Sequence, residues 1–102
     1  MTEAEVREAV RRVVDPELGV NIVDLGLVYG IDIDGARVRV VMTMTSPACP
    51  LGDYLKDTVA STIREHVRDA RDVEIVLVWE PAWSPDMMSD DVRRQLEGGE
   101  RT

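Results

Sequence analysis

The first stretch of the chain has apolar residues at the spacing of a helix. They recur every three to four positions from Val6, and Thr2 precedes them as a helix-capping residue. The helix is predicted to end near Val14. Asp15 stands before a proline, and a residue in that place is pushed out of the helical conformation. Residues 15–21 are therefore predicted to form a loop.

Strict alternation replaces the helical spacing between residues 25 and 44. Odd positions 25–33 are apolar, and so are even positions 38–44, which is the pattern of two strands that each bury one face. Asp34-Gly35 is predicted to be the two-residue turn of a hairpin, because this pair favours such turns. In the register that this turn sets, Asp24 lies opposite Thr45.

The remaining patterns predict a helix, a strand and a short helical tail. Residues 50–67 have helical spacing, and residues 73–80 are apolar on nearly both faces, as in a well-covered strand. Ser84 and Ser89 are helix-start signals, with a helix expected to about Leu96. The fold class is therefore an α/β (α+β) two-layer sandwich, helix–hairpin–helix–strand with a short C-terminal helix and a small mixed three-stranded sheet. It is expected to be one domain, 1–102, with an ordered core at about 3–97.

Composition and charge narrow the classes of function. The 102 residues, 44% hydrophobic and 31% charged, suit one globular domain. A formal net charge of −8 argues against nucleic acid or an anionic membrane as a partner, because both would be repelled. No signal-peptide pattern and no bilayer-spanning run is found, so a cytoplasmic protein is expected. No phosphate-binding loop motif is present, so no nucleotide is expected.

Cys49 is the only cysteine and lies where the strand pattern gives way to a helical one. Pro50 is a residue type favoured at the first position of a helix, which makes Cys49 the predicted N-cap. The unpaired N–H groups and the helix dipole there would lower the pKa of the thiol from its ordinary value of about 8.5, making it a better nucleophile or metal ligand. The alternative is a buried cysteine that only closes a turn.

Four motifs carry a family resemblance: Asp15-Pro16-Glu17 and the stretches 23–28, 42–50 and 79–85. In this order and spacing they resemble the SufT/PaaD-like metal–sulfur cluster biosynthesis domain family, which also supplies a component of the cytosolic iron–sulfur assembly targeting complex. The cysteine-rich C-terminal zinc segment usual in the PaaD branch is absent, so the SufT-like branch fits better. The resemblance implies a functional cluster of Asp15, Glu17, Leu18, Thr45, Ser46 and Cys49. The predicted hairpin register adds Asp24 to this cluster.

The resemblance also implies a role in the maturation of iron–sulfur proteins. The chain would carry or transfer iron–sulfur units, or recruit client apoproteins to a scaffold. A common cluster takes about four ligands, usually thiolates, and this chain offers Cys49 with Asp15 or Glu17. A cluster or iron would then be held in transit, or shared with a second subunit or a partner. A small thiol enzyme with Cys49 as nucleophile lacks a base, and a pure adaptor with a structural cysteine is the other alternative. We expect no enzyme.

The tail carries the residues that favour association. Aromatic and methionine side chains are enriched at the cores of interfaces, and Trp83 and Met87 lie in a stretch that looks exposed. We expect a homodimer, or a complex with iron–sulfur scaffold or carrier proteins and client apoproteins, with Trp83 and Met87 at or near the contact. The alternative is that both side chains pack on their own sheet.

Overall fold

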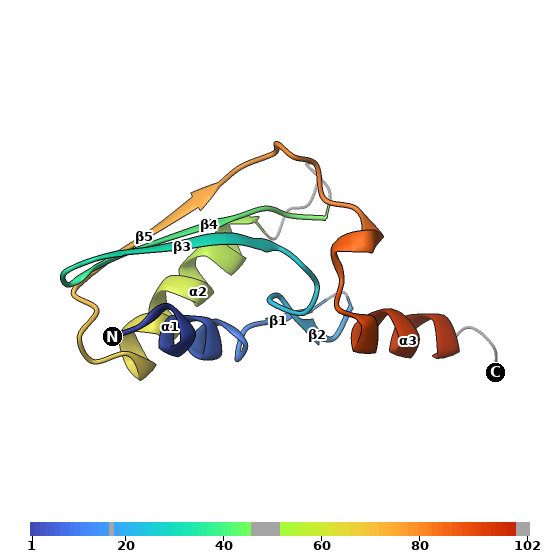
Figure 1. The fold of residues 1–102 in the computed structure, drawn as a ribbon, viewed down its shortest axis with the longest axis horizontal. Coiled ribbons are helices and arrows are strands. Elements are labelled where there is room, and N and C mark those ends of the chain that lie inside the picture. The colour runs from blue at the N-terminus through green and yellow to red at the C-terminus, as the bar shows by residue number, and fades with distance from the viewer. Residues whose placement is uncertain (17, 46–51, 100–102) are drawn as a thin grey trace.

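The structure is a computed structural model and describes all residues except 17, 46–51 and 100–102. The predicted fold class is confirmed (Figure 1). Along the chain the elements are α1 (Glu3–Val10), β1 (Val14–Asp15), β2 (Val20–Asn21), β3 (Val28–Asp34), β4 (Arg37–Met42), α2 (Gly52–His66), β5 (Asp72–Leu77), the 3-10 helix η1 (Pro85–Met87) and α3 (Asp90–Gly99).

A three-stranded sheet and two helices make the two layers. The strand order is β3-β4-β5, with β3 antiparallel and β5 parallel to the central strand β4. The helix α2 is the crossover between the two parallel strands, as such a connection requires. Both α1 and α2 lie on one face of the sheet (Figure 1), where α1 packs against β3 and α2 against β5. A separate two-stranded sheet joins β1 to β2.

The core between the layers is aliphatic, as the composition requires. The side chains that face it on α1, α2 and β4 are almost completely shielded from solvent, and each contributes on the order of 1.5–3 kcal/mol to the free energy of unfolding. None of the described helices is long and apolar enough to cross a membrane. The largest fully buried side chains are Ile22, Leu25, Leu27, Met42, Leu55, Ile63, Val6, Val10, Val13, Val38, Val40 and Val59.

The first helix begins as predicted and ends earlier. The Thr2 hydroxyl accepts the backbone N–H of Glu5 at 3.2 Å, which confirms the cap. The helix stops at Val10 rather than Val14, because the chain turns away to pair β1 with β2. The carbonyl of Val13 accepts the N–H of Ile22 at 3.0 Å and so leaves the helical ladder.

The hairpin turn lies one residue further along than predicted. Asp34 pairs with Arg37, so the two turn residues are Gly35 and Ala36. The glycine has φ +61°, which suits the first position of a two-residue hairpin turn. The observed register is favoured because it places acidic and basic side chains directly opposite each other, as in the pair of Asp34 and Arg37.

A bulge near the other end of the hairpin changes the pairing again. The register shifts between Val28 and Gly30, so Val28 pairs with Met42 and the strand β3 begins there. Residues 22–26 form a turn rather than an extension of the strand. The expected position of Asp24 opposite Thr45 is therefore wrong, because it depended on an unbroken ladder.

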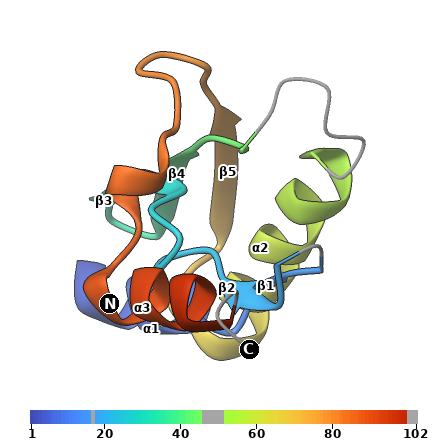
Figure 2. The ribbon, with the colours of Figure 1, turned by 90° about the vertical axis from the view of Figure 1, so that its right-hand side faces the viewer.

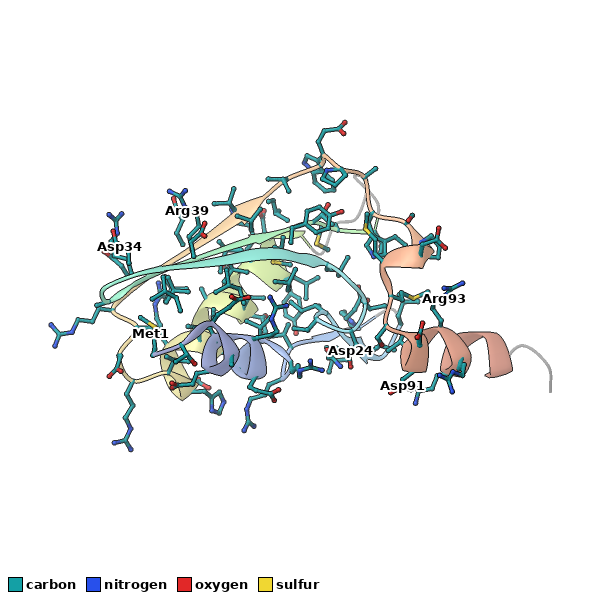
Figure 3. All side chains as sticks on the ribbon, viewed as in Figure 1. Met1, Asp24, Asp34, Arg39, Asp91 and Arg93 are labelled. Atoms are coloured by element: carbon teal, nitrogen blue, oxygen red, sulfur yellow. The ribbon has the colours of Figure 1, made fainter. Side chains whose placement is uncertain are left out.

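The strand β5 is an edge strand and is less covered than predicted. It spans Asp72–Leu77 rather than residues 73–80, and its apolar side chains are only half-buried. On the solvent face Arg39 of β4 donates from Nε to Glu74 of β5 at 2.8 Å (Figure 3). This hydrogen bond, with the negative charge of Glu74, raises the pKa of Arg39 above its ordinary value.

Residues 78–89, which we call the strap, turn back from β5 across the end of the sheet (Figures 1 and 2). The indole N–H of Trp83 donates to the Leu25 carbonyl at 2.7 Å, and the N–H of Ser89 donates to the Asp24 carbonyl at 2.7 Å. Ser84 precedes η1 and Ser89 precedes α3, so both predicted helix starts are confirmed. The final helix runs to Gly99, beyond the expected end near residue 96.

Candidate functional site

Four residues of the predicted cluster lie in the described part of the chain. These are Asp15, Leu18, Asp24 and Thr45, whereas Glu17, Ser46 and Cys49 lie outside the described residues. The N-cap position of the cysteine is therefore still a prediction, since α2 is described from Gly52 onward. The described part of the candidate site consists of two segments, the turn between β1 and β2 and the end of β4.

Asp15 is the buried carboxylate of this region, with 3% of its surface exposed. It lies at the end of β1, where the chain leaves the small sheet. Its Oδ1 accepts the N–H of Leu18 at 3.2 Å, and its backbone carbonyl accepts the N–H of Gly19 at 2.7 Å. The residue thus fixes the turn 15–19 from inside, in the way that aspartate side chains commonly hold turns. Asp15 shapes the turn rather than presenting its carboxylate to solvent.

The same turn exposes apolar side chains. Leu18 is 39% exposed, and Val14 on β1 is 48% exposed, so they are among the few large hydrophobic residues at the surface of the described chain. Leu18 was predicted from the motif, but nothing in the sequence marked Val14, which reads as the last residue of a helix. Exposed apolar side chains on a turn held by a buried carboxylate are suited to contact with another protein.

Asp24 is committed to contacts within the chain. Its Oδ1 accepts Nη1 of Arg11 at 2.8 Å, and its Oδ2 accepts Nδ2 of Asn21 at 2.9 Å. Its carbonyl binds the strap through Ser89. Figure 3 shows Asp24 beside the start of α3, where it lines a cleft of about 540 Å³ together with Asp91. These contacts tie the end of α1 to the start of α3.

The end of β4 carries two threonines. Thr45, which was predicted, is half-buried. Thr43, which was not, is completely buried, and its Oγ1 has no hydrogen-bond partner among the described residues. Its backbone N–H donates to the Leu27 carbonyl at 2.8 Å. The alternating pattern placed Thr43 on the outer face of the sheet, and sequence alone gave no sign that this position is covered.

Trp83 and Met87 contact their own chain. Besides the hydrogen bond to Leu25, the Trp83 side chain packs against the hydrophobic core. The hydroxyl of Tyr29 lies 3.5 Å from the sulfur of Met87 and donates to the Pro81 carbonyl at 2.7 Å. Both side chains are only partly buried, so these contacts support the packing alternative without testing the predicted contact with a partner.

The described residues contain no group of three or more His, Cys, Asp and Glu side chains that could hold a metal ion. The donors implied by the sequence are therefore divided between the buried Asp15 and the positions outside the description. Any iron-containing unit at this surface would need Cys49, Glu17 or groups from another molecule as further ligands.

Comparison with known proteins decides the family. Residues 3–77 match the model of the iron–sulfur cluster assembly protein family. The chain belongs to this family. It is 41% identical over 97 residues to the Fe-S protein maturation auxiliary factor of Porphyromonas gingivalis, and the aligned region covers 93% of this chain and 90% of the relative. It is 46% identical over 78 residues to the auxiliary factor SufT of Staphylococcus aureus, covering 76% and 88%.

A solved structure of this fold agrees with the architecture. The crystal structure of a domain of unknown function from Bacillus anthracis superposes with a TM-score of 0.91 at 35% identity, covering 93% of this chain and 91% of that one. The family model and the auxiliary-factor relatives confirm the resemblance to the SufT/PaaD-like family. The family match ends with β5, so the strap and α3 of this iron–sulfur assembly protein lie beyond it.

Proposed function

We propose that this chain is a maturation factor for iron–sulfur proteins. Its cargo is an iron–sulfur unit or iron, and its partners are scaffold or carrier proteins and client apoproteins. The observation that carries the proposal is the turn 15–19, where a buried Asp15 holds Leu18 outward, in a chain similar along 93% of its length to a protein maturation auxiliary factor. We place this activity in the cytoplasm.

The residues divide the task between shape and binding. Asp15 holds the turn by accepting the N–H of Leu18, and the exposed Leu18 and Val14 provide apolar contact area for a partner. Glu17 and Cys49 are the proposed donors for the cargo, with the thiolate as the softer ligand for iron. One cysteine falls short of the usual ligand count, so the cargo is held in transit and its remaining ligands come from the partner or a second subunit. No catalytic step is assigned to the chain.

The proposal is tested by replacing the gene in its host. The strain is supplied with wild-type protein, Cys49→Ala, Leu18→Asp or the surface control Asp86→Ala, and the specific activities of iron–sulfur enzymes are measured together with the amounts of their apoproteins. We expect loss of activity with normal apoprotein levels for the first two variants and wild-type activity for the control. Normal iron–sulfur enzymes in the deletion strain would reject the proposal.

The adaptor alternative predicts a different pattern, and its specific support is the exposed pair of Val14 and Leu18. If the chain only brings clients to a scaffold, Cys49→Ala would sustain maturation while Leu18→Asp would abolish it. A purified thiol enzyme would in contrast turn over a small substrate without any partner. Alkylation of Cys49 in the purified protein, followed by maturation of an apoprotein in vitro, separates the adaptor from cargo binding, because only the adaptor works without a free thiolate.

A further inference from the structure

A cleft runs between α2 and the edge of the sheet. It has a volume of about 320 Å³, and β5 contributes the half-buried side chains Val73 and Ile75 to its floor. Figure 2 shows α2 beside β5, and residues of these two elements line the cleft. The wall formed by α2 consists of Lys56, Asp57, Ala60, Ser61 and Arg64.

The outer edge of β5 is open in the described part of the chain. The sheet ends with this strand, and no other described strand pairs with it. An open edge presents a row of unpaired backbone N–H and C=O groups and is a template for another strand. Charged side chains that usually protect an edge are found only on the solvent face, at Asp72 and Glu74, and the cleft side is apolar.

Two of the three charged residues on the helix wall are placed symmetrically and have opposite sign. Asp57 and Arg64 are seven residues apart, so both lie on one face of α2 at equal distances from its small central pair, Ala60 and Ser61. In an antiparallel second α2, Asp57 would face Arg64 of the other copy, and the same pair would occur twice. Lys56 is the third charged residue of the wall, and in the same antiparallel arrangement it would face Glu65 of the other copy. A copy of the chain thus offers an opposite charge to each charged residue of the wall, whereas a partner of single charge would match only part of it.

We propose that a second copy of the chain binds here through a twofold axis that passes near Ile75 and the Ala60–Ser61 pair. The two β5 strands pair antiparallel and join the sheets into one of six strands, while the two α2 helices pack below them. With Ile75 opposite its own counterpart, Val73 lies opposite Leu77 and Glu74 opposite Val76, so no like charges meet across the new ladder. Such an interface is isologous, the commonest form of dimer.

This interface goes beyond the proposed function and limits how a cluster can be shared. Gly52, the first described residue of α2, is 8.5 residues from the midpoint of the pair. At 1.5 Å per residue, the two Gly52 residues would lie about 25 Å apart along the antiparallel helices. The dimer therefore presents the starts of its two α2 helices at opposite ends, and missing cargo ligands come from partner proteins rather than from the second copy.

The test is a charge exchange on α2, followed by sedimentation equilibrium of the purified full chain. Asp57→Arg and Arg64→Asp each place like charges together twice, and we expect each to weaken dimerisation at least tenfold, or about 1.4 kcal/mol. The double variant restores opposite pairs and should return to within about threefold of the wild type. The two positions are about 10 Å apart within one helix, too far to pair internally, so rescue reports a contact between copies.

Asp86→Arg is the matched control, because it makes the same change of charge as Asp57→Arg on an exposed residue of the strap, outside α2 and outside the cleft. At about 150 mM salt, where long-range repulsion is largely screened, we expect it to leave the dimer within about threefold of the wild type, and thermal unfolding checks that every variant folds. Hydrogen exchange should show amides of β5 that become protected as concentration rises. A wild-type monomer at about 1 mM, no rescue in the double variant, or a dimer disrupted by Trp83→Ala instead would overturn the proposal. None of these outcomes depends on iron–sulfur maturation.

Discussion

Asp15 illustrates at the scale of one residue how the predicted site is built. Among the described residues it is the buried carboxylate, and its side chain accepts the backbone N–H of Leu18 from beneath the turn. A buried acceptor of this kind costs several times more to remove than an exposed one, because the N–H that it satisfied is left without a partner. The turn thus depends on Asp15 more than on its exposed neighbours.

We therefore predict that Asp15→Ala lowers the free energy of unfolding by about 1.5–3 kcal/mol, the usual loss for a hydrogen bond to a charged group. Asp15→Asn keeps an oxygen acceptor in the same place and should cost less than about half of that. Urea unfolding at neutral pH measures both, with the exposed Asp86→Ala as control. A loss for Asp15→Ala no larger than the control's would show that the carboxylate does not hold the turn.

Part of this site could be predicted from the sequence because it is carried by local motifs. The loop after Asp15-Pro16 follows from the restriction that a proline imposes on the residue before it. The burial of Asp15 and Thr43 could not be predicted, because burial depends on tertiary packing and no periodic pattern marks either position as covered. Asp24 was misplaced because its expected position depended on an unbroken hairpin ladder, whereas the register shifts between Val28 and Gly30 and residues 22–26 form a turn.

At the scale of elements, the strap and the turn before β3 fit each other through Gly26. This residue has φ +81°, and a Cβ built on it would lie 2.8 Å from the Cβ of Met87 and closer still to the Met87 carbonyl. Only glycine both tolerates this backbone conformation and leaves room for η1. The close approach explains how the strap can rest on the backbone at residues 24–26.

We predict that Gly26→Ala displaces the strap, and Gly35→Ala is the matched control. Both residues have positive φ, so both variants should lose about 1–2 kcal/mol of stability from backbone strain. Only Gly26 meets a neighbour, whereas nothing lies within 4 Å of the position that a Cβ on Gly35 would take. Gly26→Ala should therefore lose about 1–3 kcal/mol more. It should also weaken the contact of Trp83 with the Leu25 carbonyl, which a change in tryptophan fluorescence would report. Equal losses for the two variants would contradict a tight strap.

The register of the hairpin shows where sequence reasoning stops at this scale. Alternation correctly predicted both strands and the faces that they bury. Moving the turn by one residue slides the pairing by two residues, and a slide of two keeps the apolar side chains of both strands on the same face. It could not distinguish an Asp34-Gly35 turn from a Gly35-Ala36 turn, since both are two-residue loops with a glycine. The bulge at Tyr29 left no mark in the pattern and ended the ladder before Asp24.

At the scale of the whole molecule, the net charge of −8 opposes the dimer that we propose at the β5 edge. Two such chains repel each other over the Debye length, which is about 30 Å at 0.01 M salt and about 8 Å at 0.15 M. The pairs of Asp57 with Arg64 act at short range, and exposed ion pairs contribute only about 0.2–1 kcal/mol each. The long-range repulsion and the local attraction should therefore respond to salt with opposite signs.

We predict that raising salt from about 10 to 150 mM tightens dimerisation, because screening removes more repulsion than attraction. The double variant Asp57→Arg/Arg64→Asp keeps the net charge of −8 and should show the same slope of log Kd against salt. Asp86→Arg exchanges one negative for one positive charge outside the interface, so −8 becomes −6, and its slope should be shallower. Sedimentation equilibrium over a salt series measures all three. A dimer that weakens steadily with salt would show instead that the ion pairs at α2 outweigh the repulsion between the two chains.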